Sequence, residues 1–333
     1  MSADQPTPAD ERHVPVLLER CLALLAPAID RPGAVVVDAT LGLGGHSEAF
    51  LQKFPSLFLV GIDKDEEALE IAKKRLDKTG RIAFVHDSFA NIASIASSFG
   101  RSPDFIFADL GLSSLQIDKA ARGFSYMSSG DLDMRMDSSS PLSAKEIINF
   151  WSQEELERIF QSCQEPRARY LAKVIAEERK NGEISTTGEL SGILDAHTPF
   201  KERLQTKKRV FQAVRMEVNG EKSDLEKLLT SSLKICHPGS VIMVESYHSG
   251  EDKIVKSFFQ EGICPKVPPK FPLEPEPYFK DLTRGALKAG EEETEKNSRS
   301  HLVRLRAVEV LEASKRIKIK DYNRKSLNKK VRG

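Results

Sequence analysis

The chain has 333 residues, 40% of them hydrophobic and 30% charged, and its formal net charge is +1. This length is enough for one large domain together with a smaller one. No apolar run approaches the roughly 20 residues of a membrane span, the first residues are too polar for a secretory signal, and the four cysteines form no CxxC pair. We therefore expect a cytoplasmic protein with reduced thiols and no metal site.

The first half of the chain contains four apolar segments that each end at an acidic residue. The acidic residues are Asp38, Asp63, Asp87 and Asp109, at separations of 25, 24 and 22 residues. This spacing suits a short strand followed by a crossover helix, and helical patterns occupy 46–54, 66–78 and 90–99. The sequence predicts a doubly wound α/β sheet with the carboxylates along the edge where ligands bind. Each aspartate could instead cap the helix that follows it.

A glycine-rich turn, GLGGH, follows the first strand and suggests a nucleotide-like cofactor. Asp63 comes about 20 residues after this turn, where an acidic residue accepts hydrogen bonds from both hydroxyls of a ribose. NAD and S-adenosylmethionine both carry that ribose. The turn lacks the third glycine of GxGxxG, and Asp38 beside it would repel a pyrophosphate but attract a sulfonium and an ammonium group. The sequence therefore favours S-adenosylmethionine.

Several motifs in order resemble the RsmH (MraW) family of bacterial methyltransferases. They are DATLGLGGHS, DLGLSSLQID, RGFSY, LDMRMD and FQAVRMEVNGE, with weaker matches at HVPVLLER and NSRSHLVRLRA. Members of this family methylate the exocyclic 4-amino group of a cytidine in the decoding region of 16S ribosomal RNA. The resemblance thus implies an S-adenosylmethionine-dependent enzyme that acts on 16S rRNA within the small ribosomal subunit and not on DNA, and it suggests a homodimer.

The resemblance also implies a fold and a set of donor-binding residues. The positions that match the family's donor site are Gly44, Gly45, His46, Asp63, Phe89, Asp109 and Gln116. The implied fold is a Rossmann-like class I methyltransferase sheet with an inserted small helical domain. In this chain we expect the methyltransferase domain at 1–118 and 210–314, and the inserted substrate-recognition domain at 119–209, with helices near 143–163 and 167–181. After the insertion the sheet resumes with SVIMVESYHS.

Two segments fall outside the family pattern. Where the family usually has SFHSLEDR, this chain has SYHSGEDK, so Gly250 replaces a large apolar side chain. The tail at 315–333 has nine basic residues and one acidic residue, a net charge of +8. Such an arm is typical of nucleic-acid contact, and a solubilising tail is the alternative.

Asp109 is the candidate catalytic residue. The amino nitrogen of cytosine is a poor nucleophile, and a carboxylate that accepts a hydrogen bond from it would assist methyl transfer; Asp109 could instead only contact the donor or cap the next turn. The candidate substrate-binding residues for an extruded cytidine are Arg122, Phe124, Tyr126 and Arg135. Both aromatic residues could equally lie in the core.

Three other functions remain open at this point. A DNA amino-methyltransferase would share the donor site, but its Pro-Pro-aromatic motif is absent. An NAD-dependent dehydrogenase would need a better glycine fingerprint. An RNA-binding assembly factor without turnover would not need an intact donor site.

Overall fold

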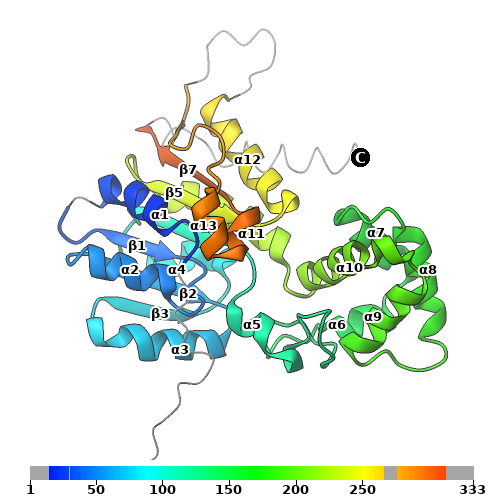
Figure 1. Ribbon diagram of the computed structural model, residues 1–333. Helices are drawn as coiled ribbons and strands as arrows, with labels where there is room; N and C mark the ends of the chain where they lie inside the picture. The colour runs from blue at the N-terminus through cyan, green and yellow to red at the C-terminus, as the bar shows by residue number, and fades with distance from the viewer. Residues whose placement is uncertain (1–14, 30, 266–275, 313–333) are drawn as a thin grey trace, which may run out of the picture.

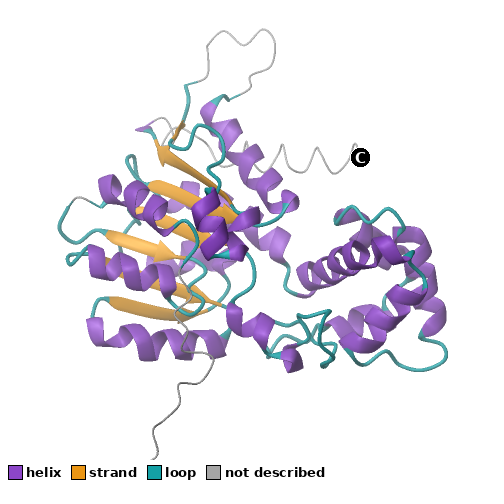
Figure 2. Cartoon of the chain, in the orientation of Figure 1, coloured by secondary structure: helices purple, strands orange, loops and turns teal. Residues whose placement is uncertain are grey.

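The computed structural model describes residues 15–29, 31–265 and 276–312, so the predicted basic tail lies outside the described residues. Figure 1 shows two parts side by side, a sheet covered by helices and a bundle of helices beside it. The strands belong to the first part, and the second is built of helices and loops (Figure 2). Among the described residues there is no helix of the length and apolarity that crossing a membrane requires. All four cysteines are free thiols.

The sheet has seven strands in the order β3-β2-β1-β4-β5-β7-β6. The strands are β1 (Val35–Asp38), β2 (Phe58–Asp63), β3 (Ile82–His86), β4 (Phe105–Asp109), β5 (Val241–Ser246), β6 (Phe279–Asp281) and β7 (Arg304–Val310). The first five pair in parallel, and β7 runs antiparallel between β5 and β6. Strand order reverses between β1 and β4, which is where open α/β sheets bind ligands. The predicted α/β, Rossmann-like fold is confirmed.

Alternate residues of the central strands face opposite sides of the sheet. Val36 packs with Phe105 and Phe107 on one side, while Val35 and Val37 pack on the other. The first side is covered by α1 (Leu18–Leu25), α2 (Gly45–Lys53) and α3 (Glu66–Leu76). The second is covered by α4 (Ile92–Ser98), α11 (Glu221–Ile235) and α12 (Ser249–Ile263). Burial on both faces explains why these strands are apolar without alternation.

The helical bundle has a core of its own, built from residues between Phe124 and Val218. Its helices are α6 (Ala144–Phe150), α7 (Gln153–Ser162), α8 (Ala168–Glu178), α9 (Thr187–Ala196) and α10 (Arg203–Val218). Two short helices, α5 (Ser114–Asp118) and α13 (Glu291–Lys296), complete the α-helices of the described residues.

Two sequence expectations for this bundle need correction. The helix expected near 143–163 is two helices, because Trp151 is extended and Ser152 starts a second capping box with Glu155. The boundary expected between residues 209 and 210 falls inside α10, whose Val210 and Val214 are fully buried in the bundle core. The bundle therefore continues to Val218.

Gly250, the departure noted in SYHSGEDK, lies in the first turn of α12. A Cβ atom at this position would lie 3.1 Å from Nδ1 of His248. That ring caps α12 by accepting a hydrogen bond from the Glu251 N–H. The imidazole therefore borders the space that a larger side chain at position 250 would need.

Gly262 gives a test of the packing between α12 and β6. A Cβ atom at Gly262 would lie 2.1 Å from Cδ2 of Phe279, so we expect Gly262→Ala to lower the free energy of unfolding by about 1–3 kcal/mol. Gly192 in α9 is the matched control, since a Cβ there meets nothing within 4 Å and Gly192→Ala should be neutral or stabilise by up to about 1 kcal/mol. Urea unfolding of both variants measures the difference. Equal stabilities would contradict the packing described here.

Candidate active site

The predicted aspartates do gather along the carboxyl edge of the sheet. Asp38, Asp63 and Asp109 are the last residues of β1, β2 and β4, and Asp87 directly follows β3. Asp87 accepts hydrogen bonds from the Ser88 N–H at 2.6 Å and from Nδ2 of Asn91 at 2.7 Å. Both donors are neighbours in the chain, but Ser88 and not Asp87 caps the helical turn that follows. Asp87 also lines the cavity beside Lys64 and Ser88.

Asp63 holds the glycine-rich loop against the end of β2. Its Oδ2 accepts a hydrogen bond from the Gly42 N–H at 2.6 Å, and its Oδ1 accepts one from the Asp65 N–H at 2.8 Å. Burial raises the pKa of this carboxyl to about 6, although both backbone hydrogen bonds oppose the rise. Each oxygen keeps acceptor capacity for a further donor.

The loop itself is shaped by two glycines with positive φ. Gly42 has φ +52°, and Gly44, the N-cap of α2, has φ +79°. A Cβ atom at Gly44 would lie 2.8 Å from Leu76 of α3, so the loop passes too close to that helix for a side chain. Gly45 and His46 then begin α2.

Asp38 lies beneath the loop, with 1% of its surface exposed. It accepts hydrogen bonds from Oγ of Ser47 at 2.5 Å and from the Thr40 N–H at 3.2 Å. Burial raises its pKa to about 6, while the Ser47 hydrogen bond lowers it. One oxygen binds the loop and the other binds the first turn of α2, so Asp38 holds these two segments together.

Asp109 is the centre of a polar cluster at the ends of β4 and β5. Its Oδ1 accepts a hydrogen bond from the Tyr247 hydroxyl at 2.8 Å, and its Oδ2 is 3.8 Å from Nδ1 of His46. Its register partner on β5 is Glu245, which is fully buried. Burial raises the pKa of Asp109, and His46 opposes that rise. The Asp109 side chain is 28% exposed, so a substrate atom can reach it.

Glu245 is a site residue that the sequence analysis did not identify. It follows the apolar run 241–244 much as the aspartates follow theirs, so the same pattern could have indicated it. Its Oε1 accepts a hydrogen bond from the Cys21 thiol at 3.2 Å. Ligand atoms of Cys21, His46 and Glu245 lie within 4.8 Å of one another, but Nε2 of His46 is 2.9 Å from the Val16 carbonyl. The Cys21 thiol, Oε1 of Glu245 and Nε2 of His46 thus already have protein partners, and the absence of a metal stays a prediction.

A second unidentified residue, Asp65, connects the segment after β4 to the sheet. It is the N-cap of α3, and its Oδ2 accepts hydrogen bonds from Nε2 of Gln116 and from Nη2 of Arg122, both at 2.9 Å. Arg122 also donates to the carbonyls of Arg135 and Met136. Gln116 is buried and, with Ser113, forms the capping box of α5. Both side chains therefore bind protein atoms.

The other candidate substrate residues lie at the junction of the sheet and the bundle. Phe124 is 8% exposed and belongs to the bundle core, as the core alternative suggested. Tyr126 is half-buried, with its ring against Phe211. Arg135 forms a bidentate ion pair with Asp133. Within the part of the chain that the structure describes, the Tyr126 hydroxyl makes no hydrogen bond, while the Tyr126 carbonyl accepts one from Oγ of Ser191.

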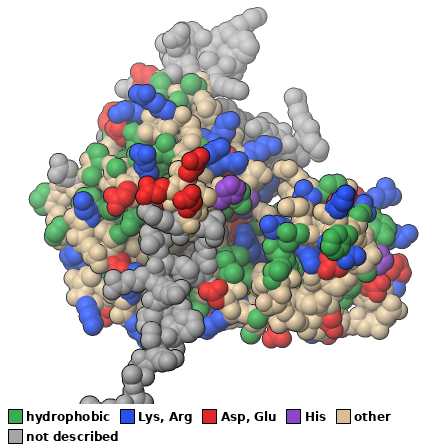
Figure 3. Space-filling model, in the orientation of Figure 1, with side chains coloured by type: hydrophobic (Ala, Val, Ile, Leu, Met, Phe, Trp, Pro, Cys, Tyr) green, Lys and Arg blue, Asp and Glu red, His purple; other side chains and the backbone are tan. Residues whose placement is uncertain are grey.

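A cavity of about 250 Å³ lies between the sheet edge and the bundle. Lys64, His86 and Ser88 line it from the sheet, and Asp137 and Asn219 line it from the other side. Phe89 follows directly, with its ring 5.9 Å from Nζ of Lys64. Figure 3 shows this face of the molecule hollowed between the two parts. The cavity therefore lies next to the row of carboxylates, on the side of the sheet edge that faces the bundle.

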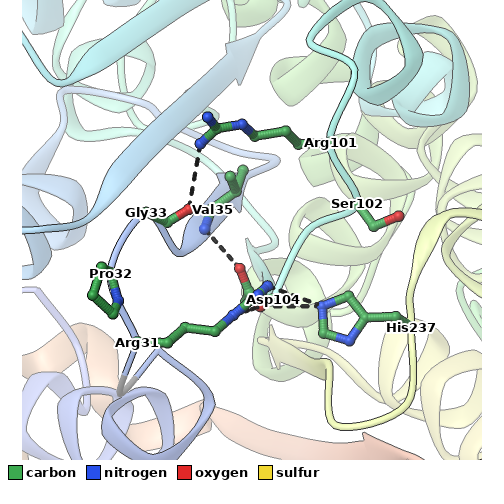
Figure 4. A pocket seen from close by; sticks show the side chains of 8 residues that line it. All are labelled: Arg31, Pro32, Gly33, Val35, Arg101, Ser102, Asp104 and His237. Atoms are coloured by element: carbon green, nitrogen blue, oxygen red, sulfur yellow. Dashed lines mark hydrogen bonds and ion pairs between the residues drawn. The ribbon is translucent and has the colours of Figure 1, made fainter.

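A larger cavity of about 390 Å³ lies at the opposite edge of the sheet, beside the start of β1 (Figure 4). Its buried carboxylate, Asp104, accepts hydrogen bonds from the Val35 N–H, from Arg31 and from His237. It is far from the switch point between β1 and β4, and its acid is fully paired. It is therefore not the candidate active site.

Comparison with known proteins shows the family of the chain. A sequence model of the MraW methylase family matches residues 10–311. A protein from Bifidobacterium longum subsp. infantis named ribosomal RNA small subunit methyltransferase H is 46% identical over 308 residues, which cover 90% of this chain and 86% of that protein. A protein of the same name from Kocuria rhizophila is 44% identical over 313 residues, covering 91% and 96%. The structure of an rRNA methylase from Streptococcus thermophilus covers 90% of this chain and 99% of its own, at 12% identity and a TM-score of 0.39, which is too low to add to the assignment.

The raised pKa of Asp38 predicts a pH effect on stability. A carboxyl whose pKa is higher in the folded state than in the unfolded state contributes stability below its unfolded pKa of about 4, and that contribution is lost as pH rises through about 6. Asp38→Asn cannot titrate, so its free energy of unfolding relative to the parent should rise by about 2–3 kcal/mol between pH 4 and pH 7. Urea unfolding at four pH values across this range measures it.

Asp137→Asn is the control with the opposite sign. Burial alone would raise the pKa of Asp137, but hydrogen bonds from Ser139 lower it overall. Its contribution is therefore present above the unfolded pKa and lost as pH falls. A pH-independent difference between Asp38→Asn and the parent would show that Asp38 is not desolvated.

Proposed function

The chain belongs to the MraW methylase family, as its motifs predicted, and from this premise we propose that it is an S-adenosylmethionine-dependent rRNA methyltransferase. Its proposed substrate is the exocyclic 4-amino group of a specific cytidine in the decoding region of 16S rRNA, within the small ribosomal subunit. The observation that carries the proposal is the pair of carboxylates at the switch point. Asp63 lies beside the glycine-rich loop, and Asp109 lies at the end of β4, partly exposed.

The residues at the switch point fit S-adenosylmethionine in chemistry. Asp63 is held with acceptor capacity left for ribose hydroxyls, and the Gly44 position leaves no room for a side chain between the loop and α3. The negative charge of the Asp109 carboxylate suits a cationic sulfonium better than a pyrophosphate. When bound, the donor supplies an electrophilic methyl group. Gly44, Gly45, His46, Asp63, Phe89 and Gln116 are the proposed donor-binding residues.

Asp109 is the proposed catalytic residue. Its carboxylate accepts a hydrogen bond from the substrate amine, which directs the nitrogen lone pair toward the methyl group, and it takes one amine proton as the new N–C bond forms. Burial keeps its pKa above the ordinary value, which makes it a stronger base than a solvated aspartate. The Tyr247 hydroxyl fixes the carboxylate at Oδ1.

The substrate side of the site is proposed at the junction of sheet and bundle. An extruded cytidine would enter between α5 and the bundle, where Tyr126 offers a ring for stacking. Arg122 and Arg135 are engaged in pairs with Asp65 and Asp133, so we propose that they order this wall of the site. The cytoplasmic location and the homodimer stay predictions.

One experiment separates this proposal from its rivals. The protein is incubated with radiolabelled S-adenosylmethionine and either small ribosomal subunits, naked 16S rRNA or duplex DNA. Label in the small subunit at N4 of a cytidine is the expected outcome. Label in DNA would favour the DNA amino-methyltransferase, and donor binding without any transfer would favour an RNA-binding assembly factor.

Asp63→Ala tests the donor site. The change removes charged hydrogen bonds to the ribose and to the glycine loop, so the dissociation constant for S-adenosylhomocysteine should rise about tenfold or more. Calorimetric titration measures it, with thermal unfolding as a check on the fold. Asp77→Ala, at an exposed residue after α3, is the control. An unchanged constant for Asp63→Ala would remove Asp63 from the donor site.

Asp109→Asn tests the base. We expect the single-turnover rate at saturating donor and RNA to fall by about 100-fold or more, with RNA affinity within a few-fold of the parent. Asparagine can still accept the Tyr247 hydrogen bond and has nearly the size of aspartate, so the fold should remain stable. A rate within a few-fold of the parent would leave Asp109 with a structural role alone.

A further inference from the structure

Asp109 and Glu245 are neighbours because of the register of two parallel strands. They are paired positions on β4 and β5, and the Leu110 N–H donates to the Glu245 carbonyl at 3.0 Å. Paired residues on adjacent strands project to the same side of a sheet, so the two carboxyl groups lie side by side. Glu245 has no exposed surface, whereas Asp109 is partly exposed. The two acids thus form a pair with one buried member and one accessible member.

The two oxygens of Glu245 have different surroundings. Oε1 accepts a hydrogen bond from the Cys21 thiol, whereas Oε2 is buried and has no donor from which to accept. Nε2 of His46 is 3.9 Å away from Oε2, beyond hydrogen-bond distance. A buried carboxyl oxygen without a donor is satisfied when it carries a proton and donates it itself. The adjacent acceptor is the Asp109 carboxylate.

Tyr247 reaches Asp109 from the turn that follows β5. Its hydroxyl donates to Oδ1 of Asp109 at 2.8 Å, and its backbone N–H donates to Oε2 of Glu251 at 3.1 Å. Its ring lies against Gly111, where φ is +131° and a Cβ atom would lie 3.3 Å from Cδ2 of the ring. The turn after β4 therefore leaves the space that the tyrosine ring needs to reach Asp109.

We propose that Tyr247 and Glu245 are positioning residues for the methyl transfer, each donating a hydrogen bond to Asp109 so that its carboxylate is ionised and held with one acceptor site directed to the substrate amine. This inference rests on the proposed function. In the step that it assists, the amine nitrogen forms a bond to the methyl carbon while the methyl–sulfur bond breaks and its electron pair stays on sulfur. Asp109 receives the proton that the nitrogen loses. Neither Tyr247 nor Glu245 gains or loses a proton.

The charged and titratable groups around Asp109 come from six other elements, one of which acts on Asp109 through Glu245. They are Cys21 of α1, Asp38 of β1, His46 of α2, Glu245 at the end of β5 with Tyr247 after it, and Glu251 of α12, with Glu293 of α13 acting on Glu245. Burial raises the pKa of both carboxyl groups. Glu245 is fully buried and its Oε2 has no donor, whereas Asp109 is partly exposed, so the shared proton is on Glu245. The Tyr247 hydrogen bond lowers the pKa of Asp109. Removal of that donor should therefore raise the pKa of the base.

The test is the pH dependence of the single-turnover rate at saturating donor and small subunits. In Tyr247→Phe, Asp109 is protonated at higher pH, so the acid limb of the profile should move up by about one pH unit or more. Glu245→Met removes the second donor and should move the limb in the same direction. Glu245→Gln keeps an N–H donor at this position and should restore the limb toward that of the parent. Tyr278→Phe, which removes a tyrosine hydroxyl on the far part of the sheet, should leave the profile unchanged.

Two further measurements keep the outcomes distinct. Calorimetric binding of S-adenosylhomocysteine and thermal unfolding are measured for every variant. If Glu245→Met does not fold, the comparison of Tyr247→Phe with Tyr278→Phe still decides the role of the Tyr247 hydroxyl. A lower rate in Tyr247→Phe with an unmoved acid limb, or equal profiles for Glu245→Gln and a folded Glu245→Met, would overturn the inference. If the parent transfers no methyl group to the small subunit, the proposed function fails instead. If Asp109→Asn keeps the full rate, methyl transfer stands, but the role of Asp109 as the base is overturned, and this inference with it.

Discussion

Two carboxyl groups that lie side by side in the interior cannot both be ionised, and the parallel pairing of β4 and β5 places Asp109 and Glu245 in that position. The fully buried acid keeps its proton, and the partly exposed acid can carry the charge. This constraint makes Glu245 the protonated donor and Asp109 the ionised acceptor before any substrate binds. It also explains why a glutamate is tolerated at the end of an apolar strand.

The sequence could predict those features that depend on neighbours along the chain. The strands ending at Asp38, Asp63 and Asp109 were predicted because an apolar run that stops at an acid is visible in the sequence. The contacts of Asp65 with Gln116 and Arg122 had no such signal, because they join α3 to a segment about 50 residues later. The break at Trp151 was missed for another reason: the capping box of Ser152 was present in the sequence but lay inside a continuous helical pattern.

Asp65 shows how the long segment after β4 becomes a wall of the site. Its carboxylate caps α3 and at the same time accepts hydrogen bonds from α5 and from Arg122. Since Arg122 also binds the carbonyls of Arg135 and Met136, one buried acid links the sheet edge to both ends of this loop. Ordering a loop rich in glycine and serine costs conformational entropy. The charged hydrogen bonds to Asp65 offset that cost.

Gly111 and Tyr247 belong to two motifs that are far apart in the sequence, and the structure shows that each depends on the other. Read alone, Gly111 suggests only a turn after β4, and Tyr247 only an aromatic residue after β5. In the structure the ring of Tyr247 lies over Gly111, where a side chain would come within 3.3 Å of it, and its hydroxyl reaches Asp109 on the strand that leads into the same turn. A larger residue at position 111 would displace the ring and with it the hydrogen bond. The glycine is therefore needed for the placement of the tyrosine as well as for its own backbone conformation.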